Sequence, residues 1–161
     1  MAVRNVHARR LAVGTDRAGA LIDTLAGADD RLWPHEWWPS MRFDRPLGVG
    51  AAGGHGPVRY RVVAYVPGQW VRFRFTGPRG FDGFHEYSVL GDGEDGAEIC
   101  HLLVMRARGA ARVTWPLLYR WLHDAVLEDS MDRAERELTG RVRRPARWNG
   151  YVRLLRRVLT R

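Results

Sequence analysis

The sequence predicts an α+β fold in which a curved antiparallel sheet of six or seven strands wraps around one long C-terminal helix. Apolar and charged residues alternate with period two over three consecutive segments between Gly56 and Leu90, which is typical of strands with one buried face. A helical pattern then runs from about Ala111 to Leu138 and ends at Gly140. Because only one face of the sheet is apolar, the long helix must cover that face.

Length and composition indicate a single domain and exclude several classes of protein. The 161 residues are 45% hydrophobic and contain no repeat, which suits one core. The only cysteine, Cys100, excludes an internal disulfide and a multi-cysteine metal site. The first residues lack the apolar run of a signal peptide, and no segment has the roughly 20 apolar residues of a membrane helix, so we expect a cytoplasmic protein.

The first forty residues predict one strand followed by two short helices. Residues 3–13 alternate loosely between polar and apolar side chains and form the first strand. Thr15 or Asp16 caps a helix that runs to about Ala26. Residues 29–40 place three tryptophans around two prolines, which predicts a short second helix and a loop whose apolar area covers another part of the protein.

A short strand over residues 41–44 and a flexible glycine-rich loop over residues 46–56 lead into the three alternating segments, which form an antiparallel meander. The loop is not a phosphate-binding loop, because no Gly-Lys-Ser/Thr ends it and no helix follows it. Pro67-Gly68 turns the chain between the first two strands of the meander and sets Arg61 opposite Arg74. The same register pairs Ala64 with Val71, Val62 with Phe73 and Tyr60 with Phe75.

The third strand of the meander contains two adjacent titratable residues, His85 and Glu86. Neighbouring side chains of a strand point to opposite faces, so either His85 or Glu86 faces the interior. The strand that follows carries His101. If Val89 and Ile99 share the buried face of these two strands, His85 and His101 share it too. The two strands cover residues 81–90 and 97–108.

The long helix changes character at His123-Asp124. Before this point it has an apolar face, which Glu128, Asp129 and Asp132 continue as acids after it. The helix therefore either leaves its partner there or meets arginines. A second face, displaced around the axis, stays apolar. The first face comprises Leu117, Leu118, Trp121, Leu122 and Ala125, and the second comprises Leu127, Met131, Ala134 and Leu138.

The order of elements and three segments resemble a known superfamily. The segments are GPVRYRVVAYVPG, RFRFTGPRGFDGFHEY and WLHDAVLEDSMDRAE. Over about residues 3–139 the chain resembles the START-like, helix-grip superfamily, and within it the bacterial polyketide cyclase/dehydrase-type members. The resemblance implies a deep apolar cavity between sheet and long helix that holds a hydrophobic or aromatic, polyketide- or lipid-like molecule without a metal or organic cofactor. The superfamily has no shared catalytic motif, so the resemblance assigns no catalytic residue.

Two functions remain open from the sequence. The protein is either a cofactor-free cyclase, aromatase or dehydratase that uses general acid/base chemistry, or a carrier or sensor that only binds its ligand. The candidate catalytic residues are His85, Glu86 and His101. The candidate ligand-binding residues are Tyr60, Val62, Phe73, Phe75, Tyr87, Leu103, Leu118, Tyr119, Trp121 and Leu122.

Other classes of function fit the sequence less well. The six histidines are scattered, without His-x-x-x-His spacing, so no metal site is predicted. None of the three serines sits in a Gly-x-Ser-x-Gly turn. Residues 1–140 carry 18 basic and 18 acidic residues and place their aromatics on the presumed buried faces, which argues against nucleic-acid binding.

Residues 141–161 form a basic segment after the ligand-binding domain of residues 1–140. They hold eight arginines and no acidic residue, and apolar residues recur among them at helical spacing, which predicts a basic amphipathic helix. Its apolar face either docks on the domain or on a second copy, or rests on an anionic membrane. That face comprises Tyr151, Leu154, Leu155 and Val158, and the opposite side carries Arg153, Arg156, Arg157 and Arg161.

Overall fold

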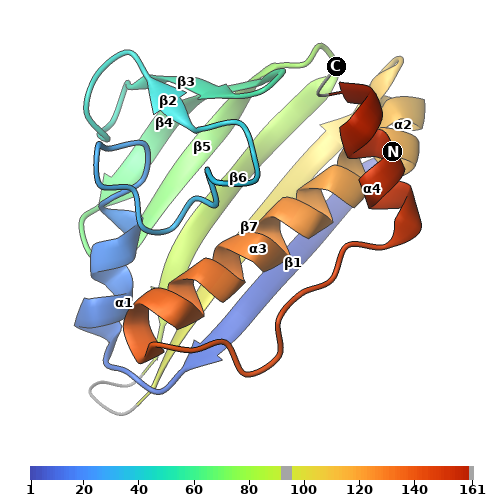
Figure 1. Ribbon diagram of the computed structural model, residues 1–161. Helices are drawn as coiled ribbons and strands as arrows, with labels where there is room; N and C mark the ends of the chain where they lie inside the picture. Colours follow the sequence, from blue (N-terminus) through green and yellow to red (C-terminus); the bar gives the residue numbers. More distant parts are fainter. Residues whose placement is uncertain (92–95, 160–161) are drawn as a thin grey trace.

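The computed structural model describes residues 1–91 and 96–159 and confirms the predicted architecture (Figure 1). Seven antiparallel strands form one curved sheet in the order β1-β7-β6-β5-β4-β3-β2, and the long helix lies against one face of it. The strands are β1 (Ala2–Leu11), β2 (Arg42–Phe43), β3 (Ala52–His55), β4 (Val58–Val66), β5 (Trp70–Gly77), β6 (Phe81–Leu90) and β7 (Ala97–Ala107). The helices are α1 (Thr15–Ile22), α2 (Ala111–Thr114), the π turn η1 (Trp115–Tyr119), α3 (Arg120–Thr139) and α4 (Gly150–Leu159).

The register of β4 and β5 confirms most of the predicted pairs and corrects one. Tyr60 pairs with Phe75, Val62 with Phe73 and Arg61 with Arg74, as predicted. Ala64 pairs with Arg72 and not with Val71, because a bulge between Val62 and Ala64 inserts an extra residue into β4. Tyr65 therefore lies opposite Val71 on the inner face, where its hydroxyl donates a hydrogen bond to Asp23.

The tryptophan-rich segment forms turns, so the predicted second helix between β1 and β2 is wrong. Asp30 explains the turns, because its carboxylate accepts hydrogen bonds from the backbone N–H groups of Ala26, Leu32 and Trp33. The segment still covers the interior as predicted, since Leu32 and Trp33 are fully buried.

The glycine-rich loop contains a strand that the sequence did not predict. β3 pairs with both β2 and β4 and so extends the sheet to seven strands. A Cβ atom on Gly53 or Gly54 would lie 1.9 Å from the carbonyl oxygen of Arg42 or Val58, so only glycine allows this close approach. The glycines that suggested a flexible loop are thus required by the sheet.

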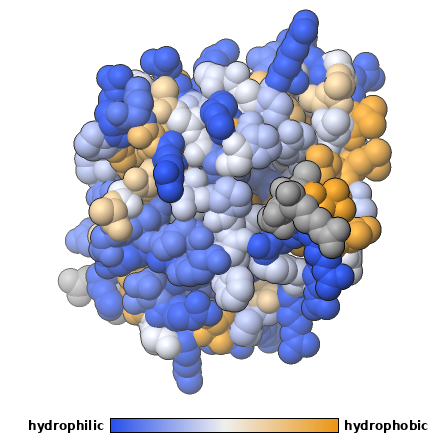
Figure 2. Space-filling view, turned by 45° about the horizontal axis from the view of Figure 1, so that its top comes forward, coloured by the Kyte–Doolittle hydropathy of each residue, from blue (hydrophilic) through white to orange (hydrophobic). Residues whose placement is uncertain are grey.

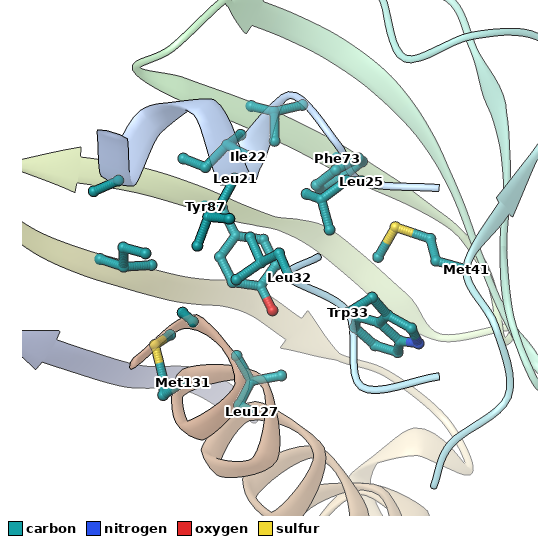
Figure 3. Packing of buried hydrophobic residues seen from close by; sticks show 14 of the residues in the cluster. Leu21, Ile22, Leu25, Leu32, Trp33, Met41, Phe73, Tyr87, Leu127 and Met131 are labelled. Carbon is teal, nitrogen blue, oxygen red and sulfur yellow. The ribbon is translucent and has the colours of Figure 1, made fainter. Parts of the chain in front are cut away.

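One half of the sheet's inner face is filled by a solid core (Figure 3). α1 and the turn after it bring Leu21, Ile22 and Leu25 onto Phe73 of β5 and Tyr87 of β6. Leu127 and Met131 of α3 close the same cluster from the other side, which is the second apolar face predicted for the long helix. A second cluster, around Phe75, Phe81, Leu103 and Trp115, occupies the half of the face nearer to α2.

The acidic residues of α3 face β1, where they meet arginine and histidine. Arg9 bonds to Glu135 at 2.6 Å and to Asp132 at 3.0 Å, and His7 bonds to Glu128 at 2.7 Å. The helix therefore stays on the sheet beyond His123-Asp124 and exchanges apolar contacts for charged ones. It ends at Gly140, whose backbone is left-handed with a φ of 78°, as the sequence predicts.

The chain after Gly140 runs back along α3 toward the start of the long helix (Figure 1). Asp132 accepts a hydrogen bond from the backbone of Ala146, and Asp129 accepts one from the Trp148 indole. α4 then packs through Val152, which is buried, while Leu154 and Val158 of the predicted apolar face stay exposed. No helix among the described residues is long and apolar enough to cross a membrane.

Candidate functional site

A cavity of about 510 Å³ lies between the sheet, the long helix and the tryptophan-rich segment. Its wall is almost entirely apolar, and its few polar groups are imidazoles, one phenol and one guanidinium. The apolar lining consists of Trp33, Trp37, Trp38, Pro39, Gly56, Pro57, Val58, Phe75, Phe81, Leu103, Trp115, Leu118, Leu122, Val126 and Leu127. The polar lining consists of His55, His85, His101, Tyr119, His123 and Arg156.

The local structure of the long helix shapes one wall of this cavity. The helix widens into the π turn η1 at Pro116, whose ring cannot donate the usual backbone hydrogen bond. Three residues of this turn, Trp115, Leu118 and Tyr119, line the cavity. Elsewhere in the cavity lining, the guanidinium of Arg156 in α4 stacks on the rings of Trp38 and Trp148, 4.6 and 3.9 Å from the ring centres. The C-terminal segment thus contributes a cationic side chain to the site.

His85 faces the interior and forms a dyad with His101. The two residues lie on the paired strands β6 and β7, and His85 Nδ1 is 3.2 Å from His101 Nε2. Both side chains are buried, with 6% and 2% of their surface exposed. Burial disfavours the charged imidazolium and lowers the pKa of both histidines well below the usual value, so both are neutral near pH 7.

Because His85 and His101 share one hydrogen bond, the tautomer of one ring determines the tautomer of the other. If His85 donates from Nδ1, its Nε2 is an acceptor and the Nδ1 of His101 carries a proton; the reverse arrangement exchanges these roles. Neither His85 Nε2 nor His101 Nδ1 has a hydrogen-bond partner among the described residues. The dyad therefore offers one free acceptor and one free donor, and a proton taken up at one end can be matched by a proton released at the other.

Glu86 lies on the outer face of the sheet, away from the cavity. Its carboxylate pairs with Arg72 on the neighbouring strand at 2.6 Å. The alternation of β6 gives this result, because His85 packs between the rings of Phe73 and Phe75 and so leaves Glu86 pointing outward. Glu86 therefore does not face the cavity, where it was a candidate catalytic residue.

Half of the predicted ligand-binding residues line the cavity and half lie elsewhere. Val62, Phe73 and Tyr87 belong to the buried core cluster and not to the cavity lining. Trp121 lies on the outer side of the long helix, with its ring against Tyr151. Tyr60 is buried against the His85 ring and does not line the cavity. The predicted residues that do line it are Phe75, Leu103, Leu118, Tyr119 and Leu122.

Sequence reasoning missed three polar residues of the wall: His55, His123 and Arg156. His55 lies in the strand that was predicted as a loop, where its ring packs on Trp33 at 4.5 Å between centres. His123 sits where the sequence marks a break in the apolar face of the helix, and that break was the available signal. Arg156 had been predicted on the solvent side of α4, and no local pattern indicates its contact with Trp38.

Three residues beside the cavity could hold a metal ion. One ligand atom each of His7, His123 and Asp124 lies within 4.8 Å of the others, and Glu128 bonds to the second nitrogen of His7. Burial of the His7 ring opposes its protonation, but hydrogen bonds and negative charge from Asp124 and Glu128 outweigh it and raise its pKa to about 9. Burial, in contrast, lowers the pKa of His123.

The buried histidines predict a loss of stability in mild acid. The pKa of His85 is lowered in the folded protein, so below pH 6.5 the unfolded chain binds more protons and folding is progressively disfavoured. Each such histidine removes about 1.4 kcal/mol of unfolding free energy per pH unit between about pH 6 and pH 5. The raised pKa of His7 has the opposite effect. It stabilises the folded protein fully below pH 6.5, and this contribution is lost as pH rises through about 9.

Urea denaturation between pH 7 and pH 5 measures this effect. His85→Gln should reduce the dependence on pH by about 1.4 kcal/mol per unit, because one group that must stay neutral has been removed. His35→Gln is the matched control, since the His35 side chain is exposed. Equal pH dependence in the wild type and in His85→Gln would contradict the neutral, buried state of His85.

Comparison with known proteins identifies the fold. A scan against protein-family models finds no matching model, and a search of curated proteins finds no match. Among solved structures, a norcoclaurine synthase mutant of Thalictrum flavum bound to a transition-state analogue superposes with a TM-score of 0.65 at 12% identity, covering 87% of this chain and 96% of that one. Another structure of that enzyme holds dopamine and hydroxybenzaldehyde and superposes with a TM-score of 0.61 at 14% identity, covering 81% of this chain and 84% of that one.

Two further proteins are similar to the same degree. CalU16 of Micromonospora echinospora has a TM-score of 0.62 at 11% identity, with 98% of this chain and 84% of that chain covered. The di-domain aromatase/cyclase StfQ of the steffimycin biosynthetic pathway has a TM-score of 0.64 at 10% identity, with 87% and 51% covered. These likenesses concern the fold alone, and they support a START-like, helix-grip fold for this chain.

Proposed function

We propose that the protein binds an aromatic, oxygen-bearing small molecule of the polyketide class in its cavity. The observation that carries the proposal is the lining: aromatic and aliphatic side chains form the wall, its histidines lie among them, and no acidic residue of the described chain lines the cavity. A volume of about 510 Å³ suits a ligand of two to four fused rings, within the range of small-molecule pockets. Norcoclaurine synthase holds aromatic molecules and StfQ is an aromatase/cyclase, and both similarities support an aromatic ligand.

The histidine dyad favours proton transfer as the chemistry of this site. A neutral imidazole with a free nitrogen accepts a proton from a phenol or from the carbon next to a carbonyl, and the coupled partner releases one. Ring closure or dehydration of a polyketide requires such transfers and needs no cofactor. The proposed activity is therefore cofactor-free cyclisation, aromatisation or dehydration, with His85 and His101 as the catalytic residues.

Filling the cavity should abolish ligand binding without unfolding the protein. Leu118 lines the cavity, whereas its neighbour Leu117 is 60% exposed, so Leu118→Trp and Leu117→Trp form a matched pair. A thermal-shift screen of polycyclic phenols and of fatty acids should raise the melting temperature of the wild type and of Leu117→Trp with the phenols. Leu118→Trp should give no shift. Silence across both ligand classes in the wild type would contradict the proposal.

Replacing the dyad should stop turnover and leave binding. Once native mass spectrometry has identified a co-purified ligand or its precursor, His85→Asn and His101→Asn are each expected to lower turnover about 100-fold or more. Glu86→Gln is the control, because Glu86 pairs with Arg72 on the outer face. Full turnover in both histidine variants would contradict the assignment of His85 and His101 as the catalytic residues, whereas a wild-type protein without turnover would be one that only binds its ligand.

A carrier function is the second candidate, and an exposed apolar ridge favours it. Figure 2 shows apolar side chains gathered on the right of the molecule, the side on which α2 and α4 lie in Figure 1. The Trp121 and Tyr151 rings pack 5.6 Å apart and join α3 to α4. Exposed arginines flank the ridge, so it suits an anionic membrane from which an apolar ligand could be loaded. The ridge comprises Val113, Leu117, Trp121, Tyr151, Leu154 and Val158, and the arginines are Arg112, Arg120, Arg153 and Arg157.

Replacing apolar residues of the ridge by aspartate should weaken membrane binding without affecting the fold. Leu154 and Val158 are 56% and 64% exposed, so Leu154→Asp with Val158→Asp removes apolar area that a membrane would bury. Binding to phosphatidylserine vesicles at low salt should weaken at least about tenfold. Val49→Asp with Val63→Asp is the control, since both residues are exposed apolar residues outside the ridge. A wild-type protein that stays in solution with these vesicles would eliminate the membrane version.

A further inference from the structure

Two histidines that are 116 positions apart in the sequence meet one carboxylate where β1 passes the start of α3. His7 Nε2 is 3.3 Å from Asp124 Oδ1, and His123 Nδ1 is 3.6 Å from the same oxygen. All three ligand atoms lie within 4.8 Å of one another. Two ligands held about 2.1 Å from a tetrahedral metal ion are about 3.4 Å apart, so the first two separations are close to those of a metal site.

Glu128 orients His7 for such a site. Its carboxylate is 2.7 Å from His7 Nδ1, so that the proton of the neutral ring lies on Nδ1 and the lone pair on Nε2. A histidine that binds a metal through one nitrogen commonly donates its other N–H to a carboxylate in this way. Nε2 is the atom that lies beside Asp124.

His123 distinguishes a metal site from a simple ion pair. An ion pair between protonated His7 and the two acids would satisfy His7, Asp124 and Glu128. It would leave His123, whose side chain is only 16% exposed, with Nδ1 3.6 Å from Asp124 and with neither ring nitrogen in a hydrogen bond to a described residue. A largely buried imidazole with two unmet hydrogen-bonding atoms is costly, and a ligand for one of them removes part of that cost.

We propose that His7, His123 and Asp124 bind one transition-metal dication of the zinc class. Two imidazoles and a carboxylate favour such ions over magnesium or calcium, which prefer oxygen ligands. Three protein ligands leave at least one coordination position open, as in catalytic rather than structural zinc sites. His123 also lines the cavity, so the metal site lies next to the cavity wall. Metal binding does not require the ligand proposed above, and it is tested without one.

Titration of the untagged, full-length protein with zinc(II) and cobalt(II) tests the site. After treatment with a chelator and dialysis, calorimetry should find one zinc ion bound per chain with a dissociation constant of about 10 μM or less, and no comparable heat with magnesium. Cobalt(II) should give the intense visible absorption of a four- or five-coordinate ion. Absence of stoichiometric zinc binding by the wild type would overturn the proposal, whatever the variants do.

Variants locate the ion. His7→Gln and His123→Gln should each abolish stoichiometric binding and the cobalt spectrum, whereas His35→Gln and His55→Gln, which change histidines outside the cluster, should retain both. Glu128→Gln tests the positioning role: the cobalt spectrum should persist while affinity falls about 10- to 100-fold. Retention of one zinc ion in both His7→Gln and His123→Gln would show that the metal binds elsewhere and overturn the assignment. If either variant fails to fold, Asp124→Asn takes its place, with the same loss expected.

Discussion

The inner face of the sheet depends on one continuous alternation of side chains across β5, β6, β7 and β1. Val71, Tyr87, His101 and His7 stand directly opposite one another on these four strands. His85 lies in the neighbouring row, between Phe73 and Leu103. A shift of one residue in any pairing would turn these histidines to solvent and bring charged residues such as Glu86 inside. The buried apolar residues of each strand oppose such a shift, and the same apolar burial thus places the polar groups of the site.

The cavity exists because the cover of the sheet is uneven. At one end α1 and the middle of α3 pack against the sheet, with Phe73 and Tyr87 in the buried core. Toward the start of the long helix the π turn at Pro116 widens the backbone, and the tryptophan-rich segment closes the opening with rings rather than with a second helix. Neutral histidines are tolerated in this apolar space because His85 and His101 bond to each other, which meets half of their hydrogen-bonding capacity. The other half is available to a ligand.

The sequence predicted the features that depend on local pattern. The turn at Pro67-Gly68, the register of Val62 with Phe73 and the end of the long helix at Gly140 follow from residues near one another in the chain. The alternation of side chains also predicted that either His85 or Glu86 faces the interior. Only the packing of His85 between aromatic rings decides between them. The bulge in β4 changes the register without a distinctive residue, which is why Ala64 was mispaired.

The remaining features depend on contacts between distant parts of the chain. Residue spacing cannot predict that His7 and His123 approach each other, because β1 must first pair with β7, about 100 residues later, and α3 must then cross it. For the same reason the sequence could not place Arg156 against Trp38, which lies 118 positions before it. Half of the predicted ligand-binding residues lie outside the cavity because alternation identifies the inner face, but not the part of that face that helices fill.

Nitrogen-detected NMR of the histidine rings between pH 7.5 and pH 5.5 tests most directly that the polar groups of the cavity are buried, neutral and paired. His85 and His101 should each show the signals of one neutral tautomer across this range, because burial lowers the pKa of both rings. The signals of His7 in the metal-free protein should be those of a doubly protonated ring throughout, since its pKa is raised to about 9. Titration of His85 and His101 with midpoints near pH 6.5 would contradict the account, because it would place both rings in water rather than in an apolar cavity.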